Sequence, residues 1–124
     1  MPPAAHPARR LLVIEDSDDG RESLEILFSL WGYEVRTAAG GAEGVAEALA
    51  WRPDAALVDI GLPGLDGYEV CRRVRAALGG AVLLIAVTAY AGQDCRARAR
   101  AAGFDHFLAK PAAPLELRRL LEAA

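Results

Sequence analysis

The chain alternates short apolar runs with longer amphipathic segments along nearly its whole length. Four of the runs are largely apolar and are followed by loop-type residues; they span 11–14, 55–58, 82–87 and 104–109. Short apolar runs of this kind are typical of strands buried on both faces of a parallel sheet. A fifth run, 33–37, alternates Tyr33, Val35 and Thr37 with charged residues, which predicts an outer strand with one better-buried face.

Helical signals fill the segments between these runs. Residues 18–31 carry apolar side chains at helical spacing and are followed by Gly32, a residue type common just past a helix end. The Asp66-x-x-Glu69 spacing is that of a capping box and predicts a helix that continues to about residue 78. Further helices are predicted over 41–51, 93–102 and 114–124. Alternating strands and helices predict an α/β fold with five parallel strands and five helices.

Length and composition exclude several classes of protein. A chain of 124 residues suits one domain with a real core, which we place at residues 10–124 after a flexible tail at 1–9. A hydrophobic share of 53% excludes extended disorder, and the tail lacks the apolar segment of a signal peptide or membrane span. The net charge of -3, without a basic stripe, gives no case for nucleic-acid binding. Cys71 and Cys95 lack paired spacing and fit free thiols in a reducing, cytoplasmic compartment.

Polar side chains follow each of the four apolar runs. They are Glu15 and Asp16 after the first run, Asp59 after the second, Thr88 after the third, and Lys110 with Pro111 after the fourth. The C-terminal ends of parallel strands lie at one edge of the sheet, where open α/β sheets bind their ligands. These side chains are therefore expected to surround a single point.

The three carboxylates among them predict a metal site. Glu15, Asp16 and Asp59 would repel one another if they were ionised together without a cation among them. Mg²⁺ suits this position because it prefers oxygen ligands and keeps waters that phosphate oxygens can replace. Asp18 and Asp19 are interpreted instead as helix-start charges, which the helix dipole favours.

A cation and a hydroxyl complete the expected chemistry. Lys110 is the only lysine of the chain, and the Thr88 hydroxyl can donate to a phosphoryl oxygen. Catalysis of phosphoryl transfer is mostly positioning and charge neutralisation, which these groups can supply. Asp59 is then the nucleophile, because a carboxylate that attacks phosphorus forms an aspartyl phosphate.

The motifs that contain these residues resemble those of response-regulator receiver domains of two-component signalling. They are VIED at 13–16, LVDIGLPGLDGYEV at 57–70, VTAY at 87–90 and KP at 110–111, and the likeness extends over residues 10–122. The stretch DIGLPGLDGYEV is similar to receivers attached to, or encoded beside, hybrid histidine kinases. The resemblance implies a flavodoxin-like, doubly wound (βα)5 sandwich with strand order 2-1-3-4-5.

The same resemblance implies a signalling phosphoacceptor rather than an enzyme, although one that assists its own phosphorylation and dephosphorylation. A histidine kinase or a histidine-phosphotransfer protein would phosphorylate Asp59. Asp16, Asp59 and the Gly61 carbonyl would bind Mg²⁺ directly, with Glu15 acting through water. Tyr90 and Pro111 would modulate the site, the latter through a cis Lys110-Pro111 bond.

The resemblance also implies a switch. Thr88 would move toward the phosphoryl group while the Phe107 ring swings inward, which would change a surface formed by the helix 93–102, the last strand and the helix from 114. That surface would bind an effector or a second copy of the chain, and it carries arginines that suit an acidic partner or Glu116 of the second copy; they are Arg96, Arg100, Arg118 and Arg119. No contact with nucleic acid or membrane is expected.

Two residues depart from the commonest pattern of the family. Glu15 replaces an aspartate, and its extra methylene can shift a metal-bound water. Phe107 replaces a tyrosine, so the ring has no hydroxyl and the switch must work by packing alone or be muted.

Two other interpretations remain open from the sequence. Asp16-x-Asp18 after a strand also resembles a haloacid-dehalogenase-like phosphatase, with Asp16 as nucleophile and Asp18 as general acid. However, no acidic metal-binding motif follows Lys110, and Asp59 is left without a role. A flavin-binding domain of similar topology would need a neutral, hydroxyl-rich phosphate loop where this chain has acids.

Overall fold

The computed structural model describes residues 9–89 and 92–123. Its sheet has five parallel strands in the order β2-β1-β3-β4-β5, which confirms the predicted α/β class and strand order. The strands are β1 (Arg10–Ile14), β2 (Glu34–Ala38), β3 (Ala55–Asp59), β4 (Leu83–Thr88) and β5 (His106–Ala109).

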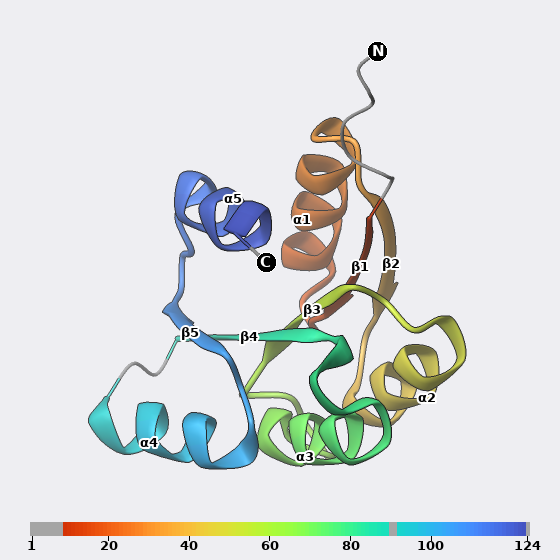
Figure 1. Cartoon of the computed structure of the whole chain (residues 1–124). Coiled ribbons are helices and arrows are strands. Elements are labelled where there is room, and N and C mark those ends of the chain that lie inside the picture. Colours follow the sequence, from red (N-terminus) through yellow and green to blue (C-terminus); the bar gives the residue numbers. More distant parts are fainter. Residues whose placement is uncertain (1–8, 90–91, 124) are drawn as a thin grey trace.

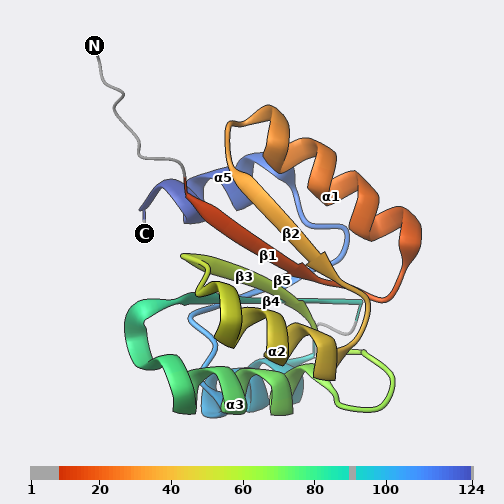
Figure 2. The same cartoon turned by 90° about the vertical axis from the view of Figure 1, so that its right-hand side faces the viewer.

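Helices lie on both faces of this sheet, as expected of a doubly wound fold. They are α1 (Asp18–Leu30), α2 (Gly41–Trp51), α3 (Gly67–Leu78), α4 (Gln93–Ala102) and α5 (Pro114–Ala123), with a short 3-10 turn, η1, at Gly79–Ala81. Figure 1 shows α1 and α5 on one face and α2, α3 and α4 on the other, and Figure 2 shows the same layers from the side. No helix in the described part of the chain is long and apolar enough to cross a membrane.

The alternation of side chains along each strand divides the core in two. In β1, Leu12 and Ile14 belong to the cluster under α2, α3 and α4, whereas Leu11 and Val13 belong to the cluster under α1 and α5. All four side chains are at most 1% exposed. Because β1 is buried on both faces, residues 11–14 are all apolar instead of alternating with polar residues.

The helix ends follow the local sequence. Asp66 precedes α3, and its carboxylate accepts a hydrogen bond from the Glu69 backbone at 3.0 Å, which is one half of the predicted capping box. The Glu69 carboxylate instead accepts from the side chains of Arg72 and Arg73. Gly103 ends α4 with φ at 115°, a conformation that favours glycine.

The last strand is shorter than the predicted run 104–109. The Phe104 backbone N–H donates to the Ala99 carbonyl at 3.1 Å, so this residue still completes the end of α4, although its side chain is buried. Asp105 pairs through its backbone with Leu84, and the strand proper begins at His106.

The predicted tail and thiols can be compared with the structure only in part. Residues 1–8 of the tail lie outside the described residues, whereas the Arg9 side chain donates to the Leu121 carbonyl at 2.5 Å. Cys71 and Cys95 are both free, as predicted. Burial raises the pKa of the Cys71 thiol to about 11, which keeps it protonated and unreactive at neutral pH.

Candidate functional site

Parallel pairing brings the predicted polar residues to one edge of the sheet. Asp59 is the last residue of β3 and pairs with Val87, which precedes Thr88 at the end of β4. Thr88 pairs in turn with Ala109, directly before Lys110. Glu15 follows the last residue of β1. The predicted convergence of strand ends is therefore present in the fold.

Three carboxylates form a compact acidic cluster at this edge. Glu15, Asp16 and Asp59 each offer an oxygen, and these atoms lie within 4.8 Å of one another. Glu15 is 5% exposed and Asp59 8% exposed, whereas Asp16 is open to solvent. Two buried carboxylates so close to a third require a compensating cation.

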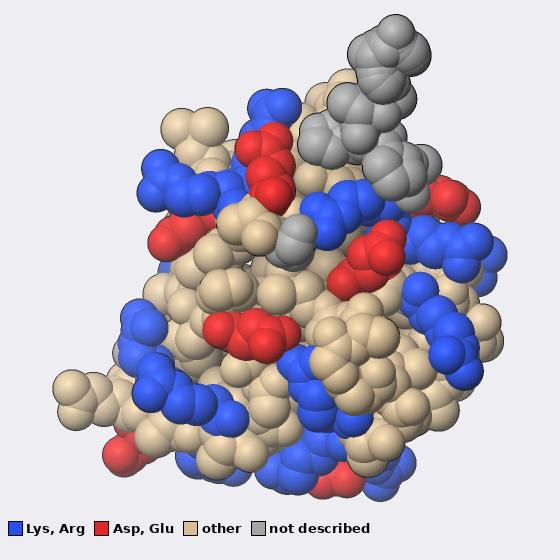
Figure 3. Space-filling view, viewed as in Figure 1, with Lys and Arg blue, Asp and Glu red and all other residues tan. Residues whose placement is uncertain are grey.

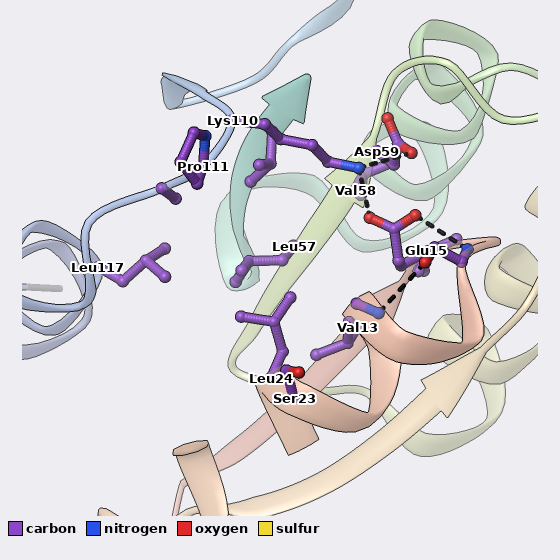
Figure 4. Close-up of a pocket in the computed structure, with 15 residues that line it drawn as sticks. Val13, Glu15, Ser23, Leu24, Leu57, Val58, Asp59, Lys110, Pro111 and Leu117 are labelled. Carbon is purple, nitrogen blue, oxygen red and sulfur yellow. Dashed lines mark hydrogen bonds and ion pairs between the residues drawn. The ribbon is translucent and has the colours of Figure 1, made fainter. Parts of the chain in front are cut away.

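Lys110 supplies a positive charge beside this cluster. Its Nζ donates to Glu15 Oε1 at 2.6 Å and to Asp59 Oδ2 at 3.1 Å; Figure 4 shows the side chain reaching between the two carboxylates. Burial by itself would lower the pKa of Lys110, but these hydrogen bonds and the nearby negative charges outweigh it and raise that pKa. The ammonium is therefore charged throughout the physiological range.

Glu15 is fixed by contacts on both of its oxygens. While Oε1 accepts from Lys110, Oε2 accepts from the Ser17 backbone at 3.1 Å. Burial raises the pKa of Glu15, and the charge of Asp59 adds to this effect against the opposing hydrogen bonds. The carboxyl is therefore one that a bound divalent cation would help to keep ionised.

Sequence reasoning missed Ser17. This residue is the N-cap of α1, and its hydroxyl accepts from the Gly20 backbone at 3.2 Å. A serine directly before two aspartates and an apolar-periodic segment is a recognisable N-cap signal. Its backbone contact with Glu15, however, depends on how the β1–α1 loop turns.

The loop after β3 holds Asp59 in place. Asp59 Oδ1 accepts from the Gly61 backbone N–H at 2.9 Å, so the Gly61 backbone lies beside the carboxylate. The Gly67 backbone returns to donate to the Ile60 carbonyl at 3.2 Å. A Cβ added at Gly67 would lie 2.7 Å from the Asp59 carbonyl oxygen, so the first turn of α3 packs against the backbone of Asp59.

The structure describes all but one of the residues assigned to the switch and to modulation. Thr88 is 1% exposed at the end of β4. Phe107 is half-buried in β5, and the Arg96 guanidinium carbon lies 4.8 Å from its ring centroid. The Lys110-Pro111 bond is cis, as the resemblance implies. Tyr90 lies outside the described residues.

A cavity of about 260 Å³ opens beside the Lys110 contacts. Its walls are mostly apolar and come from β1, β3, β4, α1, α5 and the segment after β5, with Glu15, Asp59 and Lys110 at one end. Figure 4 shows Leu24, Leu57 and Leu117 among the wall residues. Lys110, Glu15 and Asp59 therefore border a hollow that is otherwise mostly apolar.

Asp18 and Asp19 lie in the first turn of α1, as their interpretation as helix-start charges requires. Asp18 is paired with Arg21 at 2.5 Å and its side chain is 91% exposed. Asp59, not Asp18, is in contact with the only lysine of the chain. This arrangement does not support a phosphatase that uses Asp16 and Asp18.

Comparison with known proteins gives a consistent result. The family model of the response regulator receiver domain matches residues 11–122. The transcriptional regulatory protein PrrA of Mycobacterium leprae is 40% identical over 108 residues, which cover 87% of this chain and 46% of that protein. Response regulator MprA of Mycobacterium avium is 38% identical over 114 residues, which cover 92% of this chain and 50% of that protein. The chain thus spans about half the length of these curated relatives.

Solved structures show the same fold. A CheY-like response regulator receiver domain from Methanospirillum hungatei superposes with a TM-score of 0.88 at 29% identity, covering 94% of this chain and 93% of that chain. The receiver domain of a sensor histidine kinase from Pseudomonas aeruginosa, solved with magnesium coordinated in its active-site cleft, has a TM-score of 0.85 and 37% identity over 94% of this chain and 97% of that chain. With its family match, its sheet order and its cluster of strand-end carboxylates beside a lysine, this chain belongs to the response regulator receiver domains.

Proposed function

We propose that this domain accepts a phosphoryl group on Asp59 from a phosphohistidine of a histidine kinase or histidine-phosphotransfer protein. The observation that carries the proposal is the position of Asp59, a buried carboxylate in contact with Lys110 and within a cluster of acids. An Asp59 oxygen attacks phosphorus while the bond from phosphorus to the imidazole nitrogen breaks. The product is an aspartyl phosphate.

Mg²⁺ is the cation that we propose for the acidic cluster. The donor set fits, because three carboxylates supply hard oxygen ligands and the open side at Asp16 leaves room for water. Asp16, Asp59 and the Gly61 carbonyl would hold the ion, and Glu15 would act through water. The ion would supply charge neutralisation for a phosphoryl group. Receivers of the family bind this ion, and the Pseudomonas aeruginosa structure contains it.

The remaining residues of the site orient the phosphoryl group and respond to it. The Lys110 ammonium, held at the carboxylates, can pair with a phosphoryl oxygen, and the Thr88 hydroxyl can donate to another. Movement of Thr88 and Phe107 then changes the surface of α4, β5 and α5, which faces an effector or a second copy. We propose that this occurs in the cytoplasm, without direct contact of this domain with nucleic acid or membrane.

The central test is chemical labelling. With Mg²⁺ and a small acyl phosphate donor, the protein should gain one acid-stable, hydroxylamine-labile phosphoryl group, detected by intact mass. Asp59→Asn should gain none, whereas the matched control Asp18→Asn should label like the wild type, because Asp18 is paired with Arg21 away from the cluster. Unchanged labelling of the Asp59 variant would overturn the assignment. Hydrolysis of a simple phosphomonoester that survives Asp59→Ala and is lost in Asp18→Asn would instead indicate a phosphatase.

A further inference from the structure

A second pocket, of about 220 Å³, lies between α4 and β5. Arg96 and Arg100 line it from the helix, and His106 and Phe107 line it from the strand. This pocket shares no lining residue with the cavity at the acidic cluster. Phe107 belongs to it, so the ring that we assign to the switch also forms a wall of a surface pocket.

The guanidinium of Arg96 stacks on this ring. Its central carbon lies 4.8 Å from the Phe107 centroid, within the range in which a cation is attracted to the face of an aromatic ring. At an exposed site such a contact changes an equilibrium by about two- to fivefold. In the structure described here, the aromatic ring therefore holds the arginine against the pocket wall.

The pocket has an excess of positive charge. Neither Arg96 nor Arg100 forms an ion pair within the described residues. The acid in the lining, Asp105, is already engaged through its Oδ2 by Arg75 at 2.9 Å and by the Leu84 backbone at 2.8 Å. Figure 3 shows basic side chains over the lower left of the molecule, where Figure 1 places α4. The pocket thus suits a carboxylate supplied from outside.

We propose that Arg96 couples the position of Phe107 to the binding of an acidic peptide segment of a partner protein in this pocket. The proposal rests on the proposed function, because it uses the inward movement of Phe107 after phosphorylation of Asp59. When the ring leaves, Arg96 loses its stacking contact, and the pocket gains the space that the ring occupied. The guanidinium is then free to pair with a carboxylate beside Arg100 and His106.

This coupling has a defined size and is reciprocal. An acidic peptide should bind the activated form about two- to fivefold more tightly, because the resting form must first give up the contact between Arg96 and Phe107. The peptide should raise the affinity for the activating phosphoryl mimic by the same factor, since linked equilibria are symmetric.

The chain supplies a matched control on the same helix. Arg98 is also exposed and also stacks on an aromatic ring, with its guanidinium carbon 4.2 Å from the Tyr68 centroid. Tyr68 lies in α3, is buried and does not line the pocket. Arg98→Ala therefore removes the same charge and the same kind of contact as Arg96→Ala, but away from the switch ring.

The experiment measures fluorescence anisotropy of a labelled hexaglutamate peptide at low, matched ionic strength, with Mg²⁺ in every sample. Beryllium fluoride activates one set of samples, and sodium fluoride alone is added to the other. The wild type should bind the peptide about two- to fivefold more tightly in the activated set. Arg96→Ala should weaken binding and bring the ratio of the two affinities close to one, whereas Arg98→Ala should keep the wild-type ratio.

Amide shifts of Asp59 and Gly61, recorded under the same conditions, distinguish a failure of the Arg96 coupling from a failure of the proposed function. If beryllium fluoride moves these signals but peptide affinity is equal in the two sets, the coupling is wrong and the proposed function stands. The coupling is equally wrong if Arg98→Ala abolishes the ratio as fully as Arg96→Ala. If beryllium fluoride does not move the signals at all, the proposed function fails, and the coupling fails with it.

Discussion

The Nζ of Lys110 lies 2.6 Å from Oε1 of Glu15 and joins residues that are 95 positions apart in the sequence. The same atom lies 3.1 Å from Asp59 Oδ2, so one ammonium serves two of the three clustered carboxylates. It reduces the repulsion between them in the absence of a metal. Because the ammonium and a divalent cation are both attracted to these oxygens and repel each other, Lys110 should oppose the binding of the metal while favouring the phosphoryl group.

Removing the ammonium tests this opposition. In Lys110→Met, Mg²⁺ affinity measured by calorimetry should be unchanged or up to about thirtyfold tighter, because a unit charge about 4 Å from a doubly charged ion is worth about 2 kcal/mol in water. Labelling by a small acyl phosphate should nevertheless be impaired, since the phosphoryl oxygens lose their cation. Asp16→Ala is the opposing control and should weaken Mg²⁺ binding. Equal loss of Mg²⁺ affinity in both variants would show that Lys110 belongs to the metal site in another way.

The pH dependence of stability should show that the folded state disfavours the charged form of Glu15. Burial raises its pKa above the ordinary 4.5, so the folded state holds this proton more tightly than the unfolded state. The free energy of unfolding contributed by this group therefore falls as pH rises from 4.5 through the raised pKa, by at most about 1.36 kcal/mol per pH unit. Glu15→Gln cannot titrate. In urea unfolding without metal, its stability relative to the wild type should rise with pH over this window.

The opposite pH dependence of the Glu15→Gln variant would contradict a raised pKa of Glu15. A relative stability of Glu15→Gln that falls as pH rises would mean that the Lys110 contact, rather than burial, controls the carboxyl. The pKa of Glu15 would then lie below its ordinary value.

The sequence predicted the site because its residues lie at strand ends. In a parallel sheet every strand end that carries a polar group meets the same edge, so Glu15, Asp59 and Thr88 could be placed together once the apolar runs were recognised as strands. Strand order itself came from the family resemblance. Nothing in the local pattern orders β2, β1 and β3, because the order depends on how the crossovers pack.

Contacts that depend on tertiary packing could not be predicted. The stacking of Arg96 on Phe107 joins α4 to β5, and either residue alone has an unremarkable local pattern. The early part of the run 104–109 shows a similar limit. Phe104 is apolar and buried, yet its backbone completes the end of α4, so hydrophobicity alone placed the start of the last strand too early.

Close packing at Gly67 should make this residue necessary for the geometry of Asp59. An added Cβ would lie 2.6 Å from Ile60 Cα and 2.7 Å from the Asp59 carbonyl oxygen, both backbone atoms. Gly67→Ala should therefore lower the free energy of unfolding by about 1–3 kcal/mol and move the amide signals around Asp59. Gly80→Ala is the control, since a Cβ there meets nothing within 4 Å, and its effect should stay within about 0.5 kcal/mol. Similar effects of the two substitutions in urea unfolding would refute this packing argument.

The hydroxyl of Thr88 should be needed to transmit activation. Thr88 is 1% exposed, and valine has nearly the same shape, so Thr88→Val removes the hydroxyl without opening a cavity. Loss of a hydrogen bond to a charged phosphoryl mimic costs about 1.5–3 kcal/mol, so beryllium fluoride should bind this variant at least about tenfold more weakly. At saturation, amide shifts should still appear at Asp59 but not at Phe107 or along α4. Thr88→Ser keeps the hydroxyl and should restore the shifts in β5 and α4. If Thr88→Val transmits them as fully as Thr88→Ser, the hydroxyl has no part in the switch, and Phe107 must respond to Asp59 by another route.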